Sequence, residues 1–384
     1  MNRGMPEGLA RAAPTAAAGI GQWLAVVSIM IGPSGCAPVS QMTPKAASAP
    51  QNLLWPPPPD LPRFEFETVL QTAADISPET DDSRWKRAIQ GRPDTSDALV
   101  IDKPSAIVSR GGRVYVAEPG ARAVTVFDAA RKRLFRFGLR EPNGLKRPQA
   151  LALDDEGKVY VLDPLLKKVM VFDGMGLFQQ AIPLGSAFSN PVGIAVQGDG
   201  ATVYVVDRSN VDQDDHKVVA LAPDGKERFR LGPRGSGPGR FNIPLAAAVA
   251  ADGTLYVVDS GNFRVQAFNA KGEFKLQFGG AGVGIGQFSR PRAISLDHDG
   301  NIYVSDGGFN NVQIFNAAGQ LLMPLGRLSR EPGPGNYALI AGIAIDETRR
   351  LYVVDHYFKK IEVFRWLNEE EARKKASASK RAAG

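Results

Sequence analysis

Few side chains in this sequence are suited to bind a transition metal. The chain contains three histidines, His216, His298 and His356, and a single cysteine, Cys36. A zinc site needs several imidazole or thiolate ligands that converge on one ion. His298 lies in an Asp-His-Asp-Gly segment typical of a turn, and the other two histidines lie in connecting loops between predicted strands. We therefore expect no shared zinc site and assign no catalytic residue.

A cluster of carboxylates suggests a second kind of ion site. Asp212, Asp214 and Asp215 stand close together in residues 208–217 (RSNVDQDDHK). Clustered carboxylates are the ligands that Ca²⁺ prefers, but this segment has no glycine turn or distal glutamate to complete an EF-hand type of loop. We interpret it as a solvated acidic loop, with calcium as the alternative, and expect no other cofactor.

Aspartates also recur at the ends of short aliphatic segments. Asp154, Asp297 and Asp346 each stand where such a segment gives way to a turn. Because Asp accepts hydrogen bonds from turn amides, we interpret these residues as turn formers. A shared metal site is the alternative.

Another set of acids ends a Tyr-Val segment in every copy of a repeated pattern. We expect these acids to form hydrogen bonds within each copy, because a residue that recurs in every copy has a task in every copy. They are Glu118, Asp163, Asp207, Asp259, Asp306 and Asp355. Basic residues follow several of them, and we expect each to pair with a nearby acid. These are Lys168, Lys217, Arg264 and Lys360.

Two glycine-rich runs, at residues 235–239 and 280–286, superficially resemble phosphate-binding loops. Each leads into a Phe, then a Pro, then a predicted strand. No helix follows whose N-terminal amides would bind a phosphate. We therefore expect both runs to be connections between strands.

The elements that carry all these residues come from one pattern, repeated six times across residues 104–366. A small and aliphatic strand, typically opened by Pro, leads through a turn to a Tyr-Val strand that ends in an acid, and another aliphatic strand follows. The Tyr-Val anchors lie 44 to 52 residues apart, close to the spacing of four-stranded propeller blades. They are Tyr115, Tyr160, Tyr204, Tyr256, Tyr303 and Tyr352. The 41 glycines and 28 prolines also favour an all-β protein.

The repeats resemble the NHL repeat family. Residues 288–315 (FSRPRAISLDHDGNIYVSDGGFNNVQIF) keep almost the whole series of that repeat, and residues 244–268 match it as fully. The first copy departs, since it has Glu118 instead of Asp and no Asp-Gly turn. The resemblance implies an all-β fold, a six-bladed β-propeller. It leaves the function open, because NHL propellers include RNA binders, protein-interaction domains and lyases that use histidine-bound zinc.

The sixth copy lacks an outer strand after Trp366. Residues 63–70 (RFEFETVL) show the period-two alternation of a strand, and we expect them to supply that strand and close the last blade. Residues 71–103 then lead into the first blade, with a short helix around residues 85–90. Residues 368–384 are expected to form a short, charged tail, helical or disordered.

The N-terminal residues predict an export signal. An apolar stretch at residues 19–32 (GIGQWLAVVSIMIG) has the length of a signal-peptide core and is too short for a membrane span. The next residues, 33–36 (PSGC), resemble a bacterial lipobox, which implies cleavage before Cys36 and lipidation of its sulfur. Pro33 departs from the aliphatic residue usual in that motif. An ordinary signal peptide followed by an unrelated cysteine is the alternative.

Four parts are therefore expected. They are a lipoprotein signal peptide at 1–35, a Pro-rich tether at 36–62, the propeller at 63–367 and the tail at 368–384. The tether favours extended polyproline II, and Trp55 is expected to dock it onto the body. By resemblance to Gram-negative lipoproteins, Ala37 after the cysteine implies the outer membrane.

We expect a binding or scaffolding module for a protein or other partner in the cell envelope, held to the membrane by lipid and facing the periplasm. The formal net charge is +6, part of it in the tail, and with the export signal this argues against a nucleic-acid partner. Candidate contacts lie on the loops after the repeated acids: Lys167, Arg208, Phe263, Phe309, Tyr357 and Lys359. The alternative is a metal-dependent lyase or lactonase of the propeller type, and metal analysis would separate the two.

Overall fold

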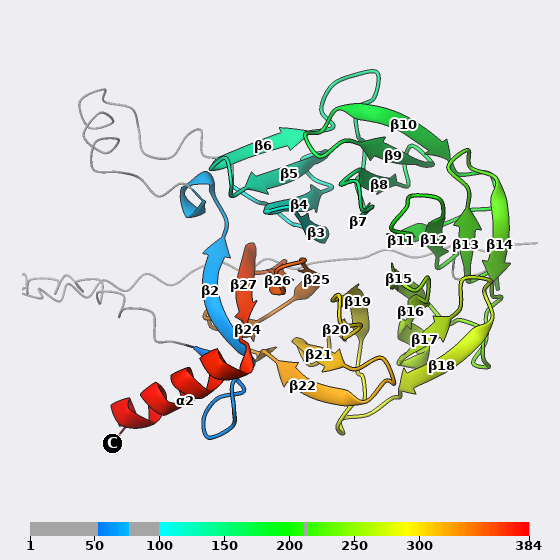
Figure 1. The fold of residues 1–384 in the computed structure, drawn as a ribbon. Coiled ribbons are helices and arrows are strands. Elements are labelled where there is room, and N and C mark those ends of the chain that lie inside the picture. The colour runs from blue at the N-terminus through cyan, green and yellow to red at the C-terminus, as the bar shows by residue number, and fades with distance from the viewer. Residues whose placement is uncertain (1–52, 77–99, 211–213, 384) are drawn as a thin grey trace, which may run out of the picture. The chain divides into compact units, whose positions relative to one another are not determined.

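Six β-sheets are arranged in a ring (Figure 1), so that the fold is the expected six-bladed β-propeller. The computed structural model describes residues 53–76, 100–210 and 214–383. All of them belong to the unit Pro50–Gly384. Cys36, Asp212 and the helix expected around residues 85–90 lie outside the described residues.

The first three blades are four-stranded antiparallel sheets whose successive strands pair. From the channel outward, blade one consists of β3 (Ala106–Arg110), β4 (Arg113–Glu118), β5 (Ala123–Asp128) and β6 (Arg133–Phe137). Blade two consists of β7 (Ala150–Leu153), β8 (Val159–Asp163), β9 (Lys168–Phe172) and β10 (Phe178–Pro183). Blade three consists of β11 (Pro191–Val196), β12 (Val203–Asp207), β13 (Lys217–Leu221) and β14 (Glu227–Leu231).

The next two blades repeat this arrangement. Blade four consists of β15 (Pro244–Val249), β16 (Leu255–Asp259), β17 (Arg264–Phe268) and β18 (Phe274–Gly279). Blade five consists of β19 (Pro291–Leu296), β20 (Ile302–Asp306), β21 (Asn311–Phe315) and β22 (Leu321–Leu325). Two 3₁₀ turns, η1 (Ala73–Asp75) and η2 (Ser260–Asn262), and a small parallel pair, β23 (Arg327–Leu328) with β24 (Asn336–Tyr337), lie between the blades or in their loops.

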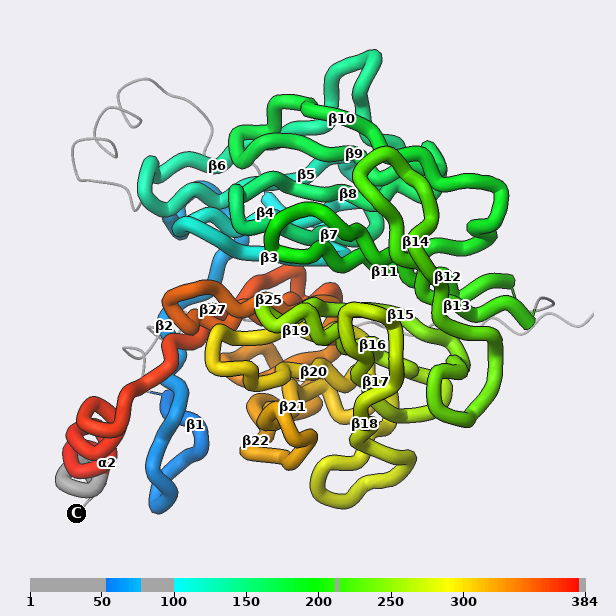
Figure 2. Tube along the Cα trace, turned by 45° about the vertical axis from the view of Figure 1, so that its right-hand side comes forward, coloured from blue at the N-terminus to red at the C-terminus, as the bar shows by residue number. Residues whose placement is uncertain are grey.

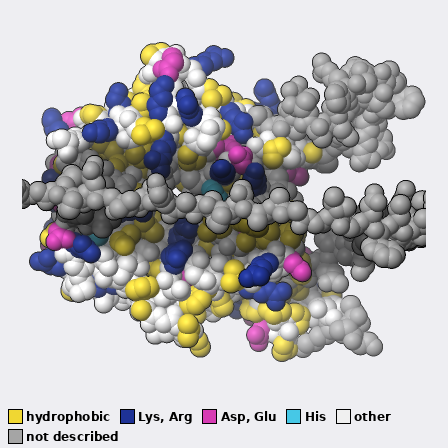
Figure 3. Space-filling view, turned by 180° about the vertical axis from the view of Figure 1, so that it is seen from behind, with side chains coloured by type: hydrophobic (Ala, Val, Ile, Leu, Met, Phe, Trp, Pro, Cys, Tyr) yellow, Lys and Arg dark blue, Asp and Glu magenta, His cyan; other side chains and the backbone are white. Residues whose placement is uncertain are grey.

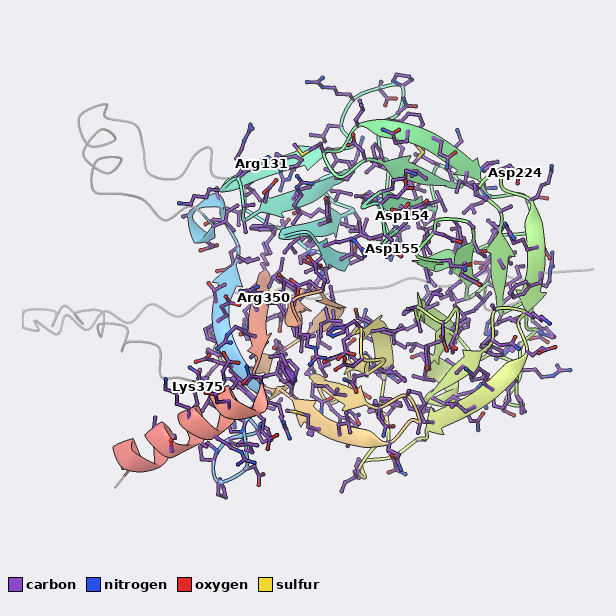
Figure 4. All side chains as sticks on the ribbon, viewed as in Figure 1. Arg131, Asp154, Asp155, Asp224, Arg350 and Lys375 are labelled. Atoms are coloured by element: carbon purple, nitrogen blue, oxygen red, sulfur yellow. The ribbon has the colours of Figure 1, made fainter. Side chains whose placement is uncertain are left out.

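Blade six is closed by the N-terminal part of the described chain, as predicted. Its inner strands are β25 (Ile340–Ile345), β26 (Arg350–Asp355) and β27 (Lys360–Trp366), and β2 (Phe64–Leu70) pairs antiparallel with β27 (Figure 1). Ion pairs support this seam. Glu65 contacts Arg365 and Lys375, and Glu67 contacts Arg350, whose side chain Figure 4 labels beside β2 together with Lys375.

The body begins before the boundary expected at residue 63. Strand β1 (Leu54–Trp55) pairs with β2, and the Leu54 side chain is buried with Leu367 and Ala372. Trp55 contacts the ring of Phe364 edge to face at 5.2 Å between centroids, which agrees with its predicted docking. These two apolar side chains gain burial on an otherwise open sheet edge, so this end of the expected tether is part of blade six.

The charged C-terminal tail forms the single α-helix of the described residues, α2 (Glu369–Ala383). Figure 2 shows it leaving the propeller on the side where the β1 hairpin lies. Ala372 is buried and Lys375 contacts Glu65, so the beginning of the helix is packed on blade six rather than fully solvated. Within the part of the chain that the structure describes, no helix is long and apolar enough to cross a membrane.

The core lies between neighbouring blades, where the side chains of the middle strands meet. A Phe near the end of the third strand is almost completely buried in five blades: Phe127, Phe172, Phe268, Phe315 and Phe364. Burying one such side chain contributes roughly 1.5–3 kcal/mol. The repeated aromatic therefore holds each blade against its neighbour and keeps the inner strands in a common register around the channel.

Candidate functional site

The inner strands present equivalent residues to the channel in successive rings. The first ring lies at the start of each inner strand or directly before it and consists of Ser105, Gln149, Val192, Leu245, Arg292 and Ala341. Alanine and glycine form the next ring. The third ring lines the cavities at both ends of the channel and is called the waist: Ile107, Leu151, Ile194, Ala247, Ile294 and Ile343. The residues that line the channel are therefore mostly small and aliphatic, as predicted.

Two cavities meet at the waist. One, of about 260 Å³, lies where the inner strands begin, and we call it the arginine mouth because Arg147, Arg208 and Arg292 line it. The other, of about 320 Å³, lies at the opposite end and is lined by Arg110 and Asp155, which form a 3.0 Å ion pair. Figure 4 labels Asp155 at the inner edge of blade two. The two ends of the channel thus differ in charge.

The three guanidinium groups come from three places in the pattern of the repeat. Arg147 precedes the Pro that begins the approach to β7, Arg292 follows the Pro that opens β19, and Arg208 follows the acid that ends β12. Antiparallel pairing brings these places together, since the opening Pro of an inner strand lies opposite the acid of the next strand, as in Pro191 with Asp207. The same end of the propeller therefore carries the mouth and the loops that follow the acids.

The arginine mouth has no acid of its own. Among the residues that line this cavity, all of them described, the charged ones are the three arginines. Arg147 and Arg208 are exposed, and Arg292 is half-buried. No ion pair or hydrogen bond joins any of the three guanidinium groups to another described residue. Burial lowers the pKa of Arg292 from its ordinary value, and the nearby charge of Arg290 acts in the same direction.

The repeated acids do not enter this cavity, because they hold the loops around it. Each is buried at the end of a second strand and accepts backbone N–H groups from the segment that leads into the inner strand of its own blade. Asp163 accepts from Lys146 and Arg147 at 2.7 Å each, and Asp306 accepts from Ser289 at 2.7 Å and from Arg290. Their predicted role within each blade is confirmed. They fix the backbone from which the arginines project.

The basic residues that follow the acids mostly pair as predicted. Arg264 lies 2.9 Å from Asp259, Lys217 lies 4.0 Å from Asp207 and contacts Asp215, and Lys360 contacts Glu362. The prediction is wrong for Lys168, which is exposed and forms no ion pair with a described residue. Asp163 lies opposite it on β8, but the two carboxylate oxygens of Asp163 accept backbone N–H groups instead.

The turn aspartates also have structural roles. Asp154, Asp297 and Asp346 each accept a hydrogen bond from the hydroxyl of the Tyr-Val anchor of the same blade, at 3.2, 3.1 and 2.9 Å. Each also accepts from backbone N–H groups of its turn. Burial and the neighbouring carboxylate raise the pKa of the three tyrosines. The interpretation as turn formers is confirmed.

The candidate contact residues all lie on loops at the end of the propeller that holds the arginine mouth, but only Arg208 lines its cavity. Tyr357 is 66% exposed, whereas Phe263 and Phe309 are half-buried. Lys359 forms a 2.7 Å ion pair with Asp102, and Lys167 is exposed. Figure 3, which shows the molecule from behind, displays Lys and Arg side chains standing among hydrophobic ones.

The proposed ion ligands do not converge. Asp214 forms a 3.1 Å ion pair with Arg234, and Asp215 contacts Lys217. The Nδ1 atom of buried His216 accepts a 3.0 Å hydrogen bond from the backbone N–H of Ile243, and burial lowers the pKa of this imidazole. His298 lies beside Asp299. Within residues 53–76, 100–210 and 214–383, no group of three His, Cys, Asp or Glu side chains is placed to hold a metal ion.

Sequence reasoning missed Arg147 and Arg292. Both could have been found from the sequence, because each is adjacent to a Pro at the start of an inner strand. Arg147 precedes Pro148 and Arg292 follows Pro291. That place in the repeat lies at a channel mouth in any propeller of this type. An arginine there is therefore a candidate ligand contact, whatever the rest of its blade contains.

This arrangement suits binding better than reaction. A guanidinium offers several N–H donors in one plane, which match the oxygens of a carboxylate or phosphate. The cavity holds one hydroxyl, that of Ser105, which donates to the carbonyl of Ala117 at 3.3 Å. It contains neither a carboxylate nor an imidazole to act as a base.

Comparison with known proteins supports the fold. The family model of the NHL repeat matches residues 241–268, which reach from the approach to blade four to the end of its third strand. No curated protein matches the chain by sequence.

Solved structures agree with this result. A structural genomics protein of unknown function from Bacteroides thetaiotaomicron is 16% identical, with 78% of this chain and 76% of that chain covered, at a TM-score of 0.55. A streptogramin B lyase structure is 15% identical, with 70% of this chain and 94% of that chain covered, at a TM-score of 0.50. Virginiamycin B lyase from Staphylococcus aureus is 14% identical, with 79% of this chain and 100% of that chain covered, also at a TM-score of 0.50. At these identities the likeness extends to the fold alone.

Proposed function

We propose that this six-bladed β-propeller of NHL type is an exported, lipid-anchored module that binds or scaffolds a partner in the cell envelope through the end that carries the arginine mouth. The observation that carries the proposal is the cavity itself. It is lined by three guanidinium groups that pair with none of the described residues, it reaches the waist, and its lining contains no acid or imidazole. Such a site recognises a ligand and lacks the groups for acid–base chemistry.

The surroundings of the cavity support a role in recognition. Buried acids pin the loops around it to their own blades, so the rim is rigid before a partner arrives. A rigid rim lowers the entropy cost of binding. Tyr357 and Leu165 stand exposed on loops at this end and offer apolar contact beside the charged cavity.

Export and anchoring rest on residues outside the described part of the chain. The apolar stretch at 19–32 and the lipobox-like residues 33–36 support a signal peptide and lipidation at Cys36, and Ala37 supports the outer membrane, with the propeller facing the periplasm. The propeller would then meet its partner at a membrane surface.

A metal-dependent lyase or lactonase is the competing function, and no group of metal ligands among the described residues favours it. The two lyase structures resemble this protein in fold only. Asp214, Asp215 and His216 are each engaged with a residue other than a common ion. Metal analysis of the purified protein, with a tightly held stoichiometric ion as the result, would favour the enzyme instead.

Photo-crosslinking in intact cells tests the proposed binding face. A photoreactive amino acid replaces Tyr357, which is 66% exposed at the arginine-mouth end, or Leu177, which is 67% exposed on a turn at the opposite end. The two sites are matched in exposure. We expect a discrete adduct of higher mass from position 357 and none from position 177. Adducts of equal yield from both positions, or from neither, would contradict the proposal.

A further inference from the structure

Arg292 is the unusual member of the arginine mouth because it combines partial burial with the lack of a partner among the described residues. Its backbone lies in β19, and it is the one charged residue of the first ring. Removing a guanidinium from water costs free energy unless an anion or several acceptors replace the water. None of the described residues supplies such an anion, so the protein bears this cost when the cavity is empty.

Arg264 shows what the same side chain does when its role is structural. Its guanidinium donates to Asp259, to Gln277 and to the carbonyl groups of Gly237 and Arg240. All of these partners lie in blade four or in its approach. The contrast between the two arginines shows that the described residues supply no anion to Arg292.

We propose that the arginine mouth binds a small organic ligand with several oxyanions, carboxylates or phosphates, which Arg147, Arg208 and Arg292 contact together. The inference rests on the proposed binding function and deepens it by naming the class of ligand.

The size and shape of the cavity restrict that class. A volume of about 260 Å³ is below the common range of drug-sized sites, so it admits a small molecule or the terminal group of a larger one. Below Arg292 the cavity is lined by small and aliphatic residues, which offer apolar contact to a short carbon skeleton.

The exposed cations at the rim attract an anionic ligand toward the cavity. Arg147 and Arg208 lie on the approaches to the cavity and attract an anion from solution, while Arg292 meets it farther inside. The repeated acids do not compete, because their oxygens are occupied by backbone N–H groups, as with Asp207 and the approach to β11. Binding should weaken as ionic strength rises, because two of the three cations are exposed.

Calorimetry on the full-length protein in detergent tests this inference with defined probes. The probes are tricarballylate, which has three carboxylates, its neutral triamide, and inorganic pyrophosphate. We expect binding of one or both anions and none of the triamide. Arg292→Gln should weaken the binding by about tenfold or more, which is typical of losing a charge-assisted hydrogen bond. Arg292→Lys keeps the charge but lacks the planar set of N–H donors, so its affinity for the anion should lie between those of the wild type and Arg292→Gln.

Two controls separate a binding role from a structural one. Arg133→Gln removes an exposed arginine of the outer strand β6 that has no ion pair with a described residue, and it should leave anion binding unchanged. Arg292→Gln should melt at the same temperature as the wild type or higher, because it removes an unpaired, half-buried charge. A lower melting temperature for Arg292→Gln, or an equal loss of binding in both variants, would overturn the inference.

Vesicles distinguish a free anion from a lipid headgroup. Phosphatidylglycerol vesicles offered to Cys36→Ser protein, which carries no lipid of its own at that site, should bind in a manner that depends on Arg292 if the phosphate belongs to a lipid. Binding of the soluble anions alone assigns a free ligand. If none of the anionic probes bound, the inference would be wrong. If the Tyr357 adduct then persisted and were unaffected by Arg292→Gln, the proposed binding function would stand without this inference. Anion binding without any adduct from position 357 would support the anion site and contradict the proposed protein-binding face.

Discussion

Arginine has two roles in this propeller, and the contacts of each guanidinium distinguish them. Arg264 is buried, is paired with Asp259 and holds the approach to its own blade. Arg292 occupies the mouth of the channel without a partner among the described residues. Residue type and solvent exposure alone would not separate these roles. The presence or absence of an anionic neighbour does, because desolvation of a charge is costly unless it is compensated.

The buried imidazole of His216 predicts a pH dependence of stability. Burial lowers its pKa in the folded protein, whereas an unfolded chain has a histidine pKa of about 6.5. As pH falls through that value, the unfolded state takes up the proton first. The stability that neutral His216 provides is therefore complete above about pH 6.5 and declines below it.

His216→Asn keeps a hydrogen-bond acceptor for Ile243 without a titrating ring. Its melting temperature should fall less between pH 7.5 and 5.5 than that of the wild type. His298→Asn, at a side chain that is 59% exposed, is the matched control and should retain the wild-type dependence. Equal pH dependence in the His216 variant and the wild type would show that this buried ring does not control acid stability.

At the scale of elements, the closure of blade six joins the two ends of the described chain. Phe64 on β2 is 2% exposed and meets the ring of Tyr303 in blade five at 6.4 Å. The closing strand therefore contacts a neighbouring blade as well as its own. It also covers the edge of β27, which would otherwise expose its backbone groups to other chains.

Phe64→Ala should lower the free energy of unfolding by about 3–5 kcal/mol, the usual cost of removing a buried Phe from a core. Phe274→Ala makes the same change on the outermost strand of blade four, where the ring is 39% exposed, and should cost much less. Denaturant unfolding of the two variants measures the difference. Similar losses would mean that β2 is a peripheral addition to the blade and not part of its closure.

At the scale of the whole molecule, we expect the proposed lipid anchor and the propeller to be separable. The buried clusters of the described chain are built from Leu54 onward. A lipid attached at Cys36 would restrain where the propeller is found without contributing to that core. The same separation allows the arginine mouth to be tested in protein that carries no lipid.

Cys36→Ser should therefore move the protein from the membrane fraction to the soluble fraction and leave its melting temperature unchanged. Wild-type protein should incorporate labelled palmitate and resist salt extraction, since several acyl chains anchor far more firmly than one. Fractionation of cells that express each form measures this. A variant that stayed with the membrane, or a wild type without label, would refute lipidation.

The six blades and the closing strand were predictable because they depend on patterns that are local in the sequence. Alternation in β2, the recurring Tyr-Val anchors and the turn aspartates each specify an element from neighbouring residues. The docking of Leu54 and Trp55 was only partly predictable, because two apolar residues in a Pro-rich segment do not specify a strand by themselves.

The arginine mouth was decided by the tertiary structure. Arg147, Arg208 and Arg292 belong to blades two, three and five, and each by itself is an ordinary loop or strand arginine. Closing the ring brings the beginnings of the inner strands to one opening, while each repeated acid accepts backbone N–H groups within its own blade. Whether a charge is paired depends on side chains that are distant in sequence, and only the folded chain places them.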